Sequence, residues 1–478
     1  MPEFHAEPYL HLAGLSHKSA LIAWGAFYFK TRSHRAGLTG ASQGKAEWKL
    51  VDDRDLRHVH PPRRESVGAR SDPFGPARVN VYDASGALVT TRFTETTNSC
   101  WVTGLSPNTE YRYEVLVKDE PWGADERWDW VRGAEQGLVQ HGGRYINRFC
   151  THPDPVAEPS GSFTFMVIGD FGTGIRRSTG TRRQYEVARA MQLAFEQHDV
   201  RMIVTTGDNI YAGHRILGIP IGGTGDEDDD WFFTFFQPYR YMLNRIPVYP
   251  CIGNHDTAET EDRDDREQLL DNLYLRERIA GDEASGRASV DPGLFYRFRY
   301  GRDVEFICID TSKEDFFRGK RLYEYPKHWE WVDQTLAPDA AARWKFVFCH
   351  HPPFNAGPNH HNTDRMETLL PLFARAGVRV VLNGHEHNFQ HSRHDGIDYL
   401  VTGADSKLDR GTPDRFNEAH TQTWSNHAHF LLVTIREETL TVRVIGELDG
   451  ESQADGLRDV PRFTPSGEEV SGPIVLRL

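Results

Sequence analysis

The chain has 478 residues, with 55 lysines and arginines against 69 aspartates and glutamates, and a formal net charge of −14. Its 38% hydrophobic residues are enough for a folded core, while the net acidity argues against a general nucleic-acid-binding protein. No apolar run approaches the roughly 20 residues needed for a membrane span. The apolar run 20–29 lacks the flanks of a signal peptide, so the sequence predicts a cytoplasmic protein unless a secretory leader has been removed.

Residues 8–152 are predicted to form an all-β sandwich. Ala20, Ile22 and Trp24 alternate as on a half-buried strand, and segments 78–83 and 87–93 flank a turn. The segment LSPNTEYRYEVLV, which contains Tyr111, resembles the tyrosine-corner strand of a fibronectin type III sandwich, with Trp24 as its core tryptophan. Two long insertions, 31–78 and 118–146, are predicted to be elaborated loops, because a compact sandwich does not need them.

From residue 162 to about 447 the pattern changes to α/β. Apolar runs end abruptly in polar residues in FTFMVIGD, VRMIVTTGD, IPVYPCIGNHD, RWKFVFCHH and VRVVLNGHEH, and a helical stretch covers 182–199. This order predicts a second domain whose functional site lies at the carboxyl ends of its strands. Residues 448–478 are predicted to be a C-terminal extension.

The strand ends carry carboxylates, imidazoles, a phenol and an amide, which together form a ligand set for metal ions. They are Asp170, Asp208, Tyr211, Asn254, His255, His350, His351, His385 and His387. Each residue alone is explained as readily by a turn, a helix cap or a buried structural histidine. Five such ends in succession are hard to produce by packing alone, and His385 and His387 would share one face if they lay on a strand. There are too many donors for one ion, which favours two metal ions that share a carboxylate.

The same motifs resemble those of the purple acid phosphatases, within the calcineurin-like metallophosphoesterases. They appear in order as GDFG, GDNIY, GNHD, VFCH and GHEH. The resemblance covers residues 162 to about 447 and implies an α/β four-layer β-sandwich flanked by helices. An N-terminal fibronectin-like sandwich also occurs in larger members of that family.

Carried over position by position, the resemblance implies two metal sites that share Asp208. One site has the ligands Asp170, Asp208, Tyr211 and His387, and the other has Asp208, Asn254, His350 and His385. A tyrosinate ligand needs a strongly polarising ion, because a phenol ordinarily has a pKa near 10, so we expect Fe(III) at the tyrosine site. The second site, with an amide and two imidazoles, suits Fe(II), Zn(II) or Mn(II).

The activity implied by the resemblance is hydrolysis of phosphate monoesters by a metal-bound hydroxide. The leaving alkoxide needs a proton, for which His255 is the first candidate. His360 and His361 are the second candidates, because they lie where the family places substrate-facing histidines. Asn254, His255 and His351 are the expected substrate contacts, although His351 has a structural explanation as well, because it precedes two prolines.

Two other functions stay open at this stage. The same metals can hydrolyse phosphodiesters such as nucleotides or phospholipid head groups. The choice between monoester and diester depends on the walls of the pocket. A binding or adhesion protein with an inert metal domain is the other alternative, although every ligand position is filled. The predicted partner is a small phosphorylated substrate, with no nucleic-acid polymer, and the sequence makes no prediction of oligomeric state.

Overall fold

The computed structural model describes residues 4–32, 47–50, 74–123, 145–173, 183–211, 214–216, 219–221, 231–257, 265–278, 294–313, 319–338, 342–409, 411–448 and 456–478. Most of the two expected insertions, 31–78 and 118–146, falls outside these residues. None of the helices in the described ranges is long and apolar enough to cross a membrane.

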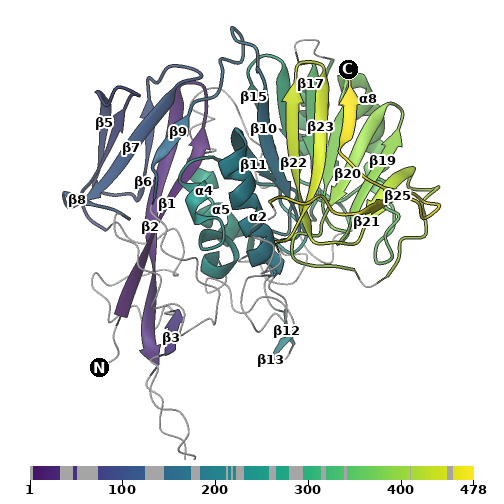
Figure 1. Cartoon of the computed structure of the whole chain (residues 1–478), viewed down its shortest axis with the longest axis horizontal. Coiled ribbons are helices and arrows are strands. Elements are labelled where there is room, and N and C mark those ends of the chain that lie inside the picture. The colour runs from purple at the N-terminus through teal and green to yellow at the C-terminus, as the bar shows by residue number, and fades with distance from the viewer. Residues whose placement is uncertain are drawn as a thin grey trace, which may run out of the picture.

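The N-terminal part consists of two antiparallel sheets, which confirms the all-β prediction (Figure 1). In the first sheet β2 (Ser19–Arg32) pairs with β1 (Phe4–Leu15), β3 (Glu47–Leu50) and β6 (Ser99–Thr103). In the second, β4 (Ala77–Tyr82) and β7 (Glu110–Val117) are central, with β5 (Leu88–Thr94), β8 (Glu120–Pro121) and β9 (Arg148–Cys150) at the edges. The amide of Ser106 donates a hydrogen bond to the hydroxyl of Tyr111 at 2.8 Å, the bond expected of a tyrosine corner.

The prediction that the strand around Trp24 is half-buried is wrong. Trp24 lies in the core, but Leu21 and Ala23, on the opposite face of β2, are equally buried. The first sheet packs against the α/β part of the chain, where Phe27 contacts the rings of Phe232 and Phe236. A strand buried on both faces loses its alternation of apolar and polar residues, and here Leu21, Ala23 and Phe27 make the second face apolar.

Two sheets face each other in the α/β part. The six-stranded sheet has the order β14 (Val248–Tyr249), β11 (Val200–Thr205), β10 (Phe163–Ile168), β22 (His429–Arg436), β23 (Thr439–Gly446) and β26 (Ile474–Arg477). The nine-stranded sheet has the order β15 (Tyr296–Tyr300), β16 (Val304–Cys308), β17 (Trp344–Phe348), β18 (Val380–Asn383), β20 (Ile397–Thr402), β19 (Phe389–His394), β21 (Thr421–Ser425), β24 (Arg462–Phe463) and β25 (Glu469–Val470). Phe165 meets Phe306 and Phe346 edge to face between the sheets.

Helices cover the outer faces of this pair of sheets, which gives the expected four layers. On one side α2 (Arg183–Gln197) contacts β22 and β23, and its residues at helical spacing are buried as predicted. In Figure 1, α2, α4 (Arg240–Leu243) and α5 (Asp265–Asn272) lie between the N-terminal sheets and the six-stranded sheet. On the other side α7 (Pro326–Thr335) and α8 (Leu370–Ala376) form a second core with β17 and β18.

Short elements complete the fold. A π-helical turn (Phe232–Phe236) precedes α4, two 3-10 turns (Leu322–Glu324 and Asp364–Leu369) precede α7 and α8, and β12 (His214–Ile216) pairs with β13 (Ile219–Ile221). The C-terminal residues, expected as an extension after residue 447, supply β24 and β25 to one sheet and β26 to the other. They therefore pack with both sheets of the α/β part.

Candidate metal centre

The polar residues of the five motifs follow the carboxyl ends of strands from both sheets. Asp170 follows β10, Asp208 follows β11, Asn254 follows β14, His350 follows β17 and His385 follows β18. Since β10, β11 and β14 are parallel, as are β17 and β18, their carboxyl ends lie on one side of the molecule. The structure thereby brings together residues that are more than 200 positions apart in the sequence.

Three of these residues have backbone conformations that side chains normally avoid. Asp170, Asp208 and His385 have φ angles of +55°, +50° and +73°. A residue other than glycine in this region costs about 1 to 2 kcal/mol, so such conformations persist where the surrounding structure enforces them, often at functional sites. Gly253 of the GNHD motif serves close packing, because a Cβ there would lie 2.1 Å from Oδ1 of Asp208.

One half of the centre contains Asp170, Tyr211 and His387. The hydroxyl of Tyr211 donates a hydrogen bond to Oδ1 of Asp170 at 3.0 Å and lies 3.3 Å from Nε2 of His387. That nitrogen is 3.6 Å from Oδ1 of Asp170. A carboxylate, a phenol and an imidazole thus meet within a few ångströms, with Asp170 and Tyr211 buried and His387 partly exposed.

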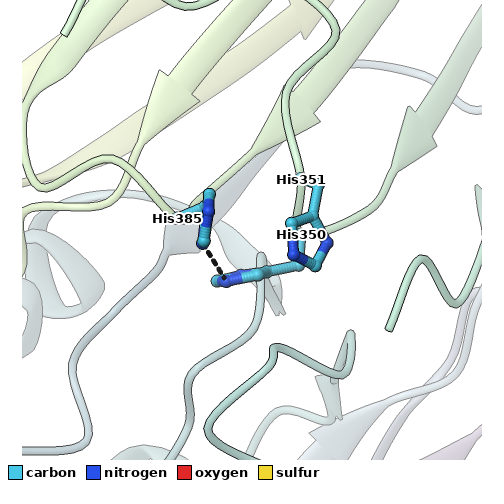
Figure 2. A group of neighbouring side chains, drawn as sticks. All are labelled: His350, His351 and His385. Atoms are coloured by element: carbon cyan, nitrogen blue, oxygen red, sulfur yellow. Dashed lines mark hydrogen bonds between the residues drawn. The ribbon is translucent and has the colours of Figure 1, made fainter. Parts of the chain in front are cut away.

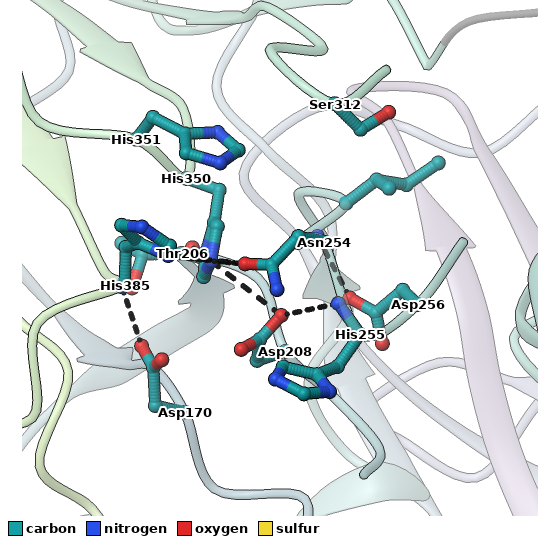
Figure 3. Close-up of polar contacts among 12 residues, drawn as sticks. Asp170, Thr206, Asp208, Asn254, His255, Asp256, Ser312, His350, His351 and His385 are labelled. Atoms are coloured by element: carbon teal, nitrogen blue, oxygen red, sulfur yellow. Dashed lines mark hydrogen bonds and ion pairs between the residues drawn. The ribbon is translucent and has the colours of Figure 1, made fainter. Parts of the chain in front are cut away.

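The other half contains Asn254, His350 and His385 (Figure 3). Oδ1 of Asn254 lies 2.9 Å from Nε2 of His350 and 3.0 Å from Nδ1 of His385. The two ring nitrogens are 3.2 Å apart, and Nε2 of His350 is also 3.5 Å from Oδ1 of Asp208. Asp208 therefore lies at the boundary between the two halves.

The protonation of His350 shows that this half fits a cation. Its Nδ1 lies 2.8 Å from the carbonyl oxygen of Thr206, which can only accept, so that nitrogen carries the proton. Burial lowers the pKa of His350, which keeps the ring neutral and leaves Nε2 with a lone pair. That lone pair faces the oxygens of Asn254 and Asp208, an arrangement that repels unless a positive ion lies between them.

The carboxylates lead to the same conclusion. Burial and the neighbouring charge of Asp208 raise the pKa of Asp170 well above its usual range. Burial also opposes ionisation of Asp208, but electrostatic interactions with the His350 and His255 side chains, together with the hydrogen bond from the amide of His255, outweigh it and lower the pKa of Asp208. Two buried carboxyl groups this close favour a bound cation over two free negative charges.

His351, expected as a substrate contact, is buried beside the second half. Ring nitrogens of His350, His351 and His385 lie within 4.8 Å of one another (Figure 2). Nδ1 of His351 is 2.9 Å from Oγ1 of Thr311, and its ring centroid is 4.5 Å from that of His385. Asp170, Asp208 and His350 make a second group of the same kind.

Two of the three expected proton donors lie at the centre. The amide of His255 donates a hydrogen bond to Oδ1 of Asp208 at 2.9 Å, and its ring centroid lies 4.5 Å from that of Tyr211. The ring of His360 packs on that of His385 at 3.9 Å. His361 is exposed and has no hydrogen bond or ring contact with the centre residues that the structure describes.

The prediction that His385 and His387 lie on a strand is wrong. Both follow β18 in a bend, and the positive φ angle of His385 breaks the strand there. The bend directs His385 toward Asn254 and His387 toward Tyr211. The two imidazoles therefore serve different halves of the centre.

Sequence reasoning missed carboxylates that hold the ligand loops. Asp256 accepts hydrogen bonds from the amides of Asn209 (2.9 Å), Ile210 (3.1 Å) and Gly253 (2.8 Å), and one from the side chain of Asn209 at 2.8 Å. Oδ1 of Asp409 lies 3.2 Å from Nδ1 of His387. Asp256 belongs to the GNHD motif, so its position beside a ligand was the available signal, whereas Asp409 lies in no motif.

Glu386, between the two histidines of GHEH, was missed as well. It is buried and turned toward the loop 355–360, where it accepts hydrogen bonds from the amide and from Nδ1 of His360 at 3.0 and 2.8 Å. It also accepts one from Nδ2 of Asn355 at 3.0 Å and one from the amide of Asn359 at 3.2 Å. Glu386 thus fixes the position of His360 over His385.

Comparison with known proteins agrees with this geometry. Residues 163–389 match the sequence model of the calcineurin-like phosphoesterase family. Purple acid phosphatase 4 of Arabidopsis thaliana is 27% identical over 306 residues, which cover 62% of this chain and 83% of that protein.

Two solved structures have a similar fold over almost the whole chain. PhoD matches with a TM-score of 0.59 and 13% identity, covering 97% of this chain and 91% of that one. Purple acid phosphatase PPD1 from yellow lupin matches with a TM-score of 0.55 and 14% identity, covering 99% and 74%. Residues 163–389 therefore form a calcineurin-like phosphoesterase domain, and purple acid phosphatases are among the relatives of the chain.

Proposed function

We propose that this chain is a phosphatase that hydrolyses phosphate monoesters at a binuclear metal centre. The observation that carries the proposal is the pair of donor clusters that meet at Asp208, one around Tyr211 and one around Asn254. Relatives that are purple acid phosphatases, together with the calcineurin-like domain, support the same activity.

In this proposal Asp170, Asp208, Tyr211 and His387 hold one ion, and Asp208, Asn254, His350 and His385 hold the other. Burial and the charges of Asp170 and Asp208 raise the pKa of Tyr211 well above its usual value, so only a strongly polarising ion can bind it as tyrosinate. We assign Fe(III) to that site for this reason, and Fe(II), Zn(II) or Mn(II) to the other. When bound, the two ions would supply Lewis acidity toward the phosphoryl oxygens and the water nucleophile.

The ligand charges explain how an acidic protein attracts phosphate. Two carboxylates and one tyrosinate carry three negative charges, against five positive charges on a trivalent and a divalent ion. The centre is then positive by two charges, although the chain carries −14. A dianionic phosphate is drawn to this place because burial strengthens the interaction.

Protein side chains position the substrate and deliver a proton. In this proposal Asn254, His255 and His351 contact the phosphoryl group. The leaving alkoxide requires a proton, which a histidine supplies well near its ordinary pKa. Of the two candidate proton donors in the loop 355–361, His360 is better placed than His361, because Glu386 holds it on the ring of His385.

Turnover of a monoester and a diester, measured side by side, tests the proposal. We expect the metal-loaded protein to hydrolyse p-nitrophenyl phosphate, to prefer it over bis(p-nitrophenyl) phosphate, and to lose activity when a chelator removes the ions. His350→Ala removes a proposed ligand and is expected to be inactive. The matched control is His427→Ala, which replaces a histidine outside the proposed ligand set. Faster hydrolysis of the diester, or activity that survives metal removal, would contradict the proposal.

A further inference from the structure

A segment outside every motif passes beside the metal ligands. Residues 403–409 follow β20, and the segment is fixed at both ends to ligand residues. Oγ of Ser406 donates a hydrogen bond to the carbonyl oxygen of Asp170 at 3.0 Å, and the amide of Asp409 donates one to the carbonyl oxygen of His387 at 3.1 Å. Lys407 lies between these two attachment points, so its backbone position is determined by the centre itself.

The ammonium group of Lys407 lies over the ring of Tyr211. Nζ is 3.3 Å from the ring centroid, close enough for a cation–π interaction. The side chain is half-buried, and Nζ makes no hydrogen bond to any residue in the described ranges. An ammonium has three N–H donors, and a partly dehydrated one without acceptors favours an anion nearby.

The nearest fixed charges explain the position of Lys407 but do not bind it. Asp208, Asp170 and Asp409 all act electrostatically on the ammonium, but none of the three accepts a hydrogen bond from it. When ions occupy the centre, Asp170 and Asp208 direct their oxygens to those ions. The N–H donors of Lys407 are then available to a ligand at the centre.

We propose that Lys407 is a substrate-binding residue that donates a hydrogen bond to a phosphoryl oxygen of the bound monoester. This inference rests on the proposed function and adds to it a source of specificity for dianionic phosphate. The two ions bind oxygens of any phosphate ester, whereas a monoester keeps one more charged oxygen than a diester. A lysine beside the Tyr211 half of the centre favours the ester that carries that additional charge.

Binding of inorganic phosphate to the metal-loaded protein tests the inference without turnover. We compare wild type with Lys407→Met, Lys407→Arg and Lys320→Met by calorimetry. Lys320 is the matched control, because it is exposed and its Nζ lies over the ring of Tyr325 at 4.9 Å, away from the centre. Metal content and thermal unfolding are measured for each protein, so that loss of ions or of folding is detected separately.

We expect Lys407→Met to weaken phosphate binding about tenfold to a hundredfold, the usual effect of losing one charged hydrogen bond. Lys407→Arg should recover most of the affinity, and Lys320→Met should bind as wild type does. For hydrolysis, Lys407→Met should raise KM for p-nitrophenyl phosphate more than KM for bis(p-nitrophenyl) phosphate.

Unchanged phosphate binding in Lys407→Met would overturn the inference. Equal effects on the two esters, or loss of a metal ion from Lys407→Met, would overturn it too, since Lys407 would then support the centre without contacting substrate. If Lys407→Met does not fold, Lys407→Arg is compared with Lys407→Gln instead. The inference is then overturned if Lys407→Arg does not bind phosphate more tightly than Lys407→Gln. A wild type that binds phosphate through Lys407 but hydrolyses no ester would refute only the proposed function.

Discussion

The hydroxyl of Tyr211 donates a hydrogen bond to Oδ1 of Asp170 at 3.0 Å. In this contact Tyr211 is a neutral phenol, as its raised pKa requires. A metal ion that binds both oxygens must displace the phenolic proton. Which ion can bind at this site therefore depends on the phenolic oxygen of Tyr211.

The variant Tyr211→Phe tests the iron assignment. Without the phenol, the proposed first site keeps Asp170, Asp208 and His387 but loses the one proposed ligand that would produce a visible tyrosinate band. We expect the purified variant to be colourless and to contain less iron, while the second metal is retained. Metal analysis together with the visible spectrum measures both effects. A coloured Tyr211→Phe protein, or a colourless wild type with two zinc or manganese ions, would remove the iron assignment.

Glu386→Gln tests the position of His360. The amide replaces one carboxylate oxygen with a donor, so at least one of the four hydrogen bonds from the loop 355–360 is lost. We expect hydrolysis of alkyl phosphates, which have poor leaving groups, to fall about tenfold to a hundredfold, and hydrolysis of p-nitrophenyl phosphate to fall much less.

Glu196→Gln is the control for this experiment, because Glu196 is an exposed acceptor on α2. It should hydrolyse both classes of ester at the wild-type rate. If Glu386→Gln slowed alkyl and aryl phosphates by the same factor, proton donation by His360 would not explain the effect.

Asp256→Asn tests the role of the missed carboxylate. Asp256 accepts four hydrogen bonds that join the loop of Asp208 to that of Asn254, and the asparagine would direct its own N–H groups at some of these donors. We expect the free energy of unfolding to fall by about 2 to 4 kcal/mol, with weaker metal binding. Urea unfolding of the metal-free protein measures the first effect and competition with a chelator the second.

Asp154→Asn provides the comparison, since Asp154 also accepts hydrogen bonds from two backbone amides but far from the centre. It should leave metal affinity unchanged. Wild-type metal affinity in Asp256→Asn would show that Asp256 does not position the ligand loops.

Two buried histidines predict a loss of stability in acid. Burial lowers the pKa of His11 and of His152 to about 3, and neither nitrogen of His11 has a hydrogen-bond partner among the described residues. Both side chains titrate near pH 6.5 in the unfolded chain, so the unfolded state binds more protons between pH 6.5 and 3. The free energy of unfolding therefore falls as pH drops through this range, by about 2 kcal/mol per histidine at pH 5.

His152→Gln isolates this effect. We expect the variant to lose about 2 kcal/mol less than wild type between pH 7.5 and pH 5, measured by urea unfolding of metal-free protein. The exposed His361→Gln should follow the wild-type curve. A His152→Gln protein with the wild-type pH dependence would contradict the role given to His152.

The strand ends that carry the centre were predictable because two local signals coincide there. A run such as FTFMVI is buried along its whole length, and the polar residue that follows, Asp170, marks the carboxyl end. The tyrosine corner at Tyr111 and the helix over 183–197 were predictable for similar local reasons. Each signal needs only a few neighbouring residues.

Other features depend on contacts between distant segments and left no such signal. Leu21 and Ala23 are buried because the N-terminal sheet packs on the turn around Phe232, more than 200 residues later. Lys407 and Asp409 reach the centre because their segment is attached to Asp170 and His387, and nothing in GADSKLD indicates that. The bend at His385 was missed because spacing alone does not distinguish a bend from a strand.

Metal content and turnover of Asp208→Asn test the central claim most directly, since Asp208 joins the two halves of the centre. We expect wild type to hold two metal ions per chain and to hydrolyse p-nitrophenyl phosphate, and Asp208→Asn to hold fewer than one and to have no measurable activity. An Asp208→Asn protein with two ions per chain and wild-type turnover would contradict a binuclear centre built on this residue.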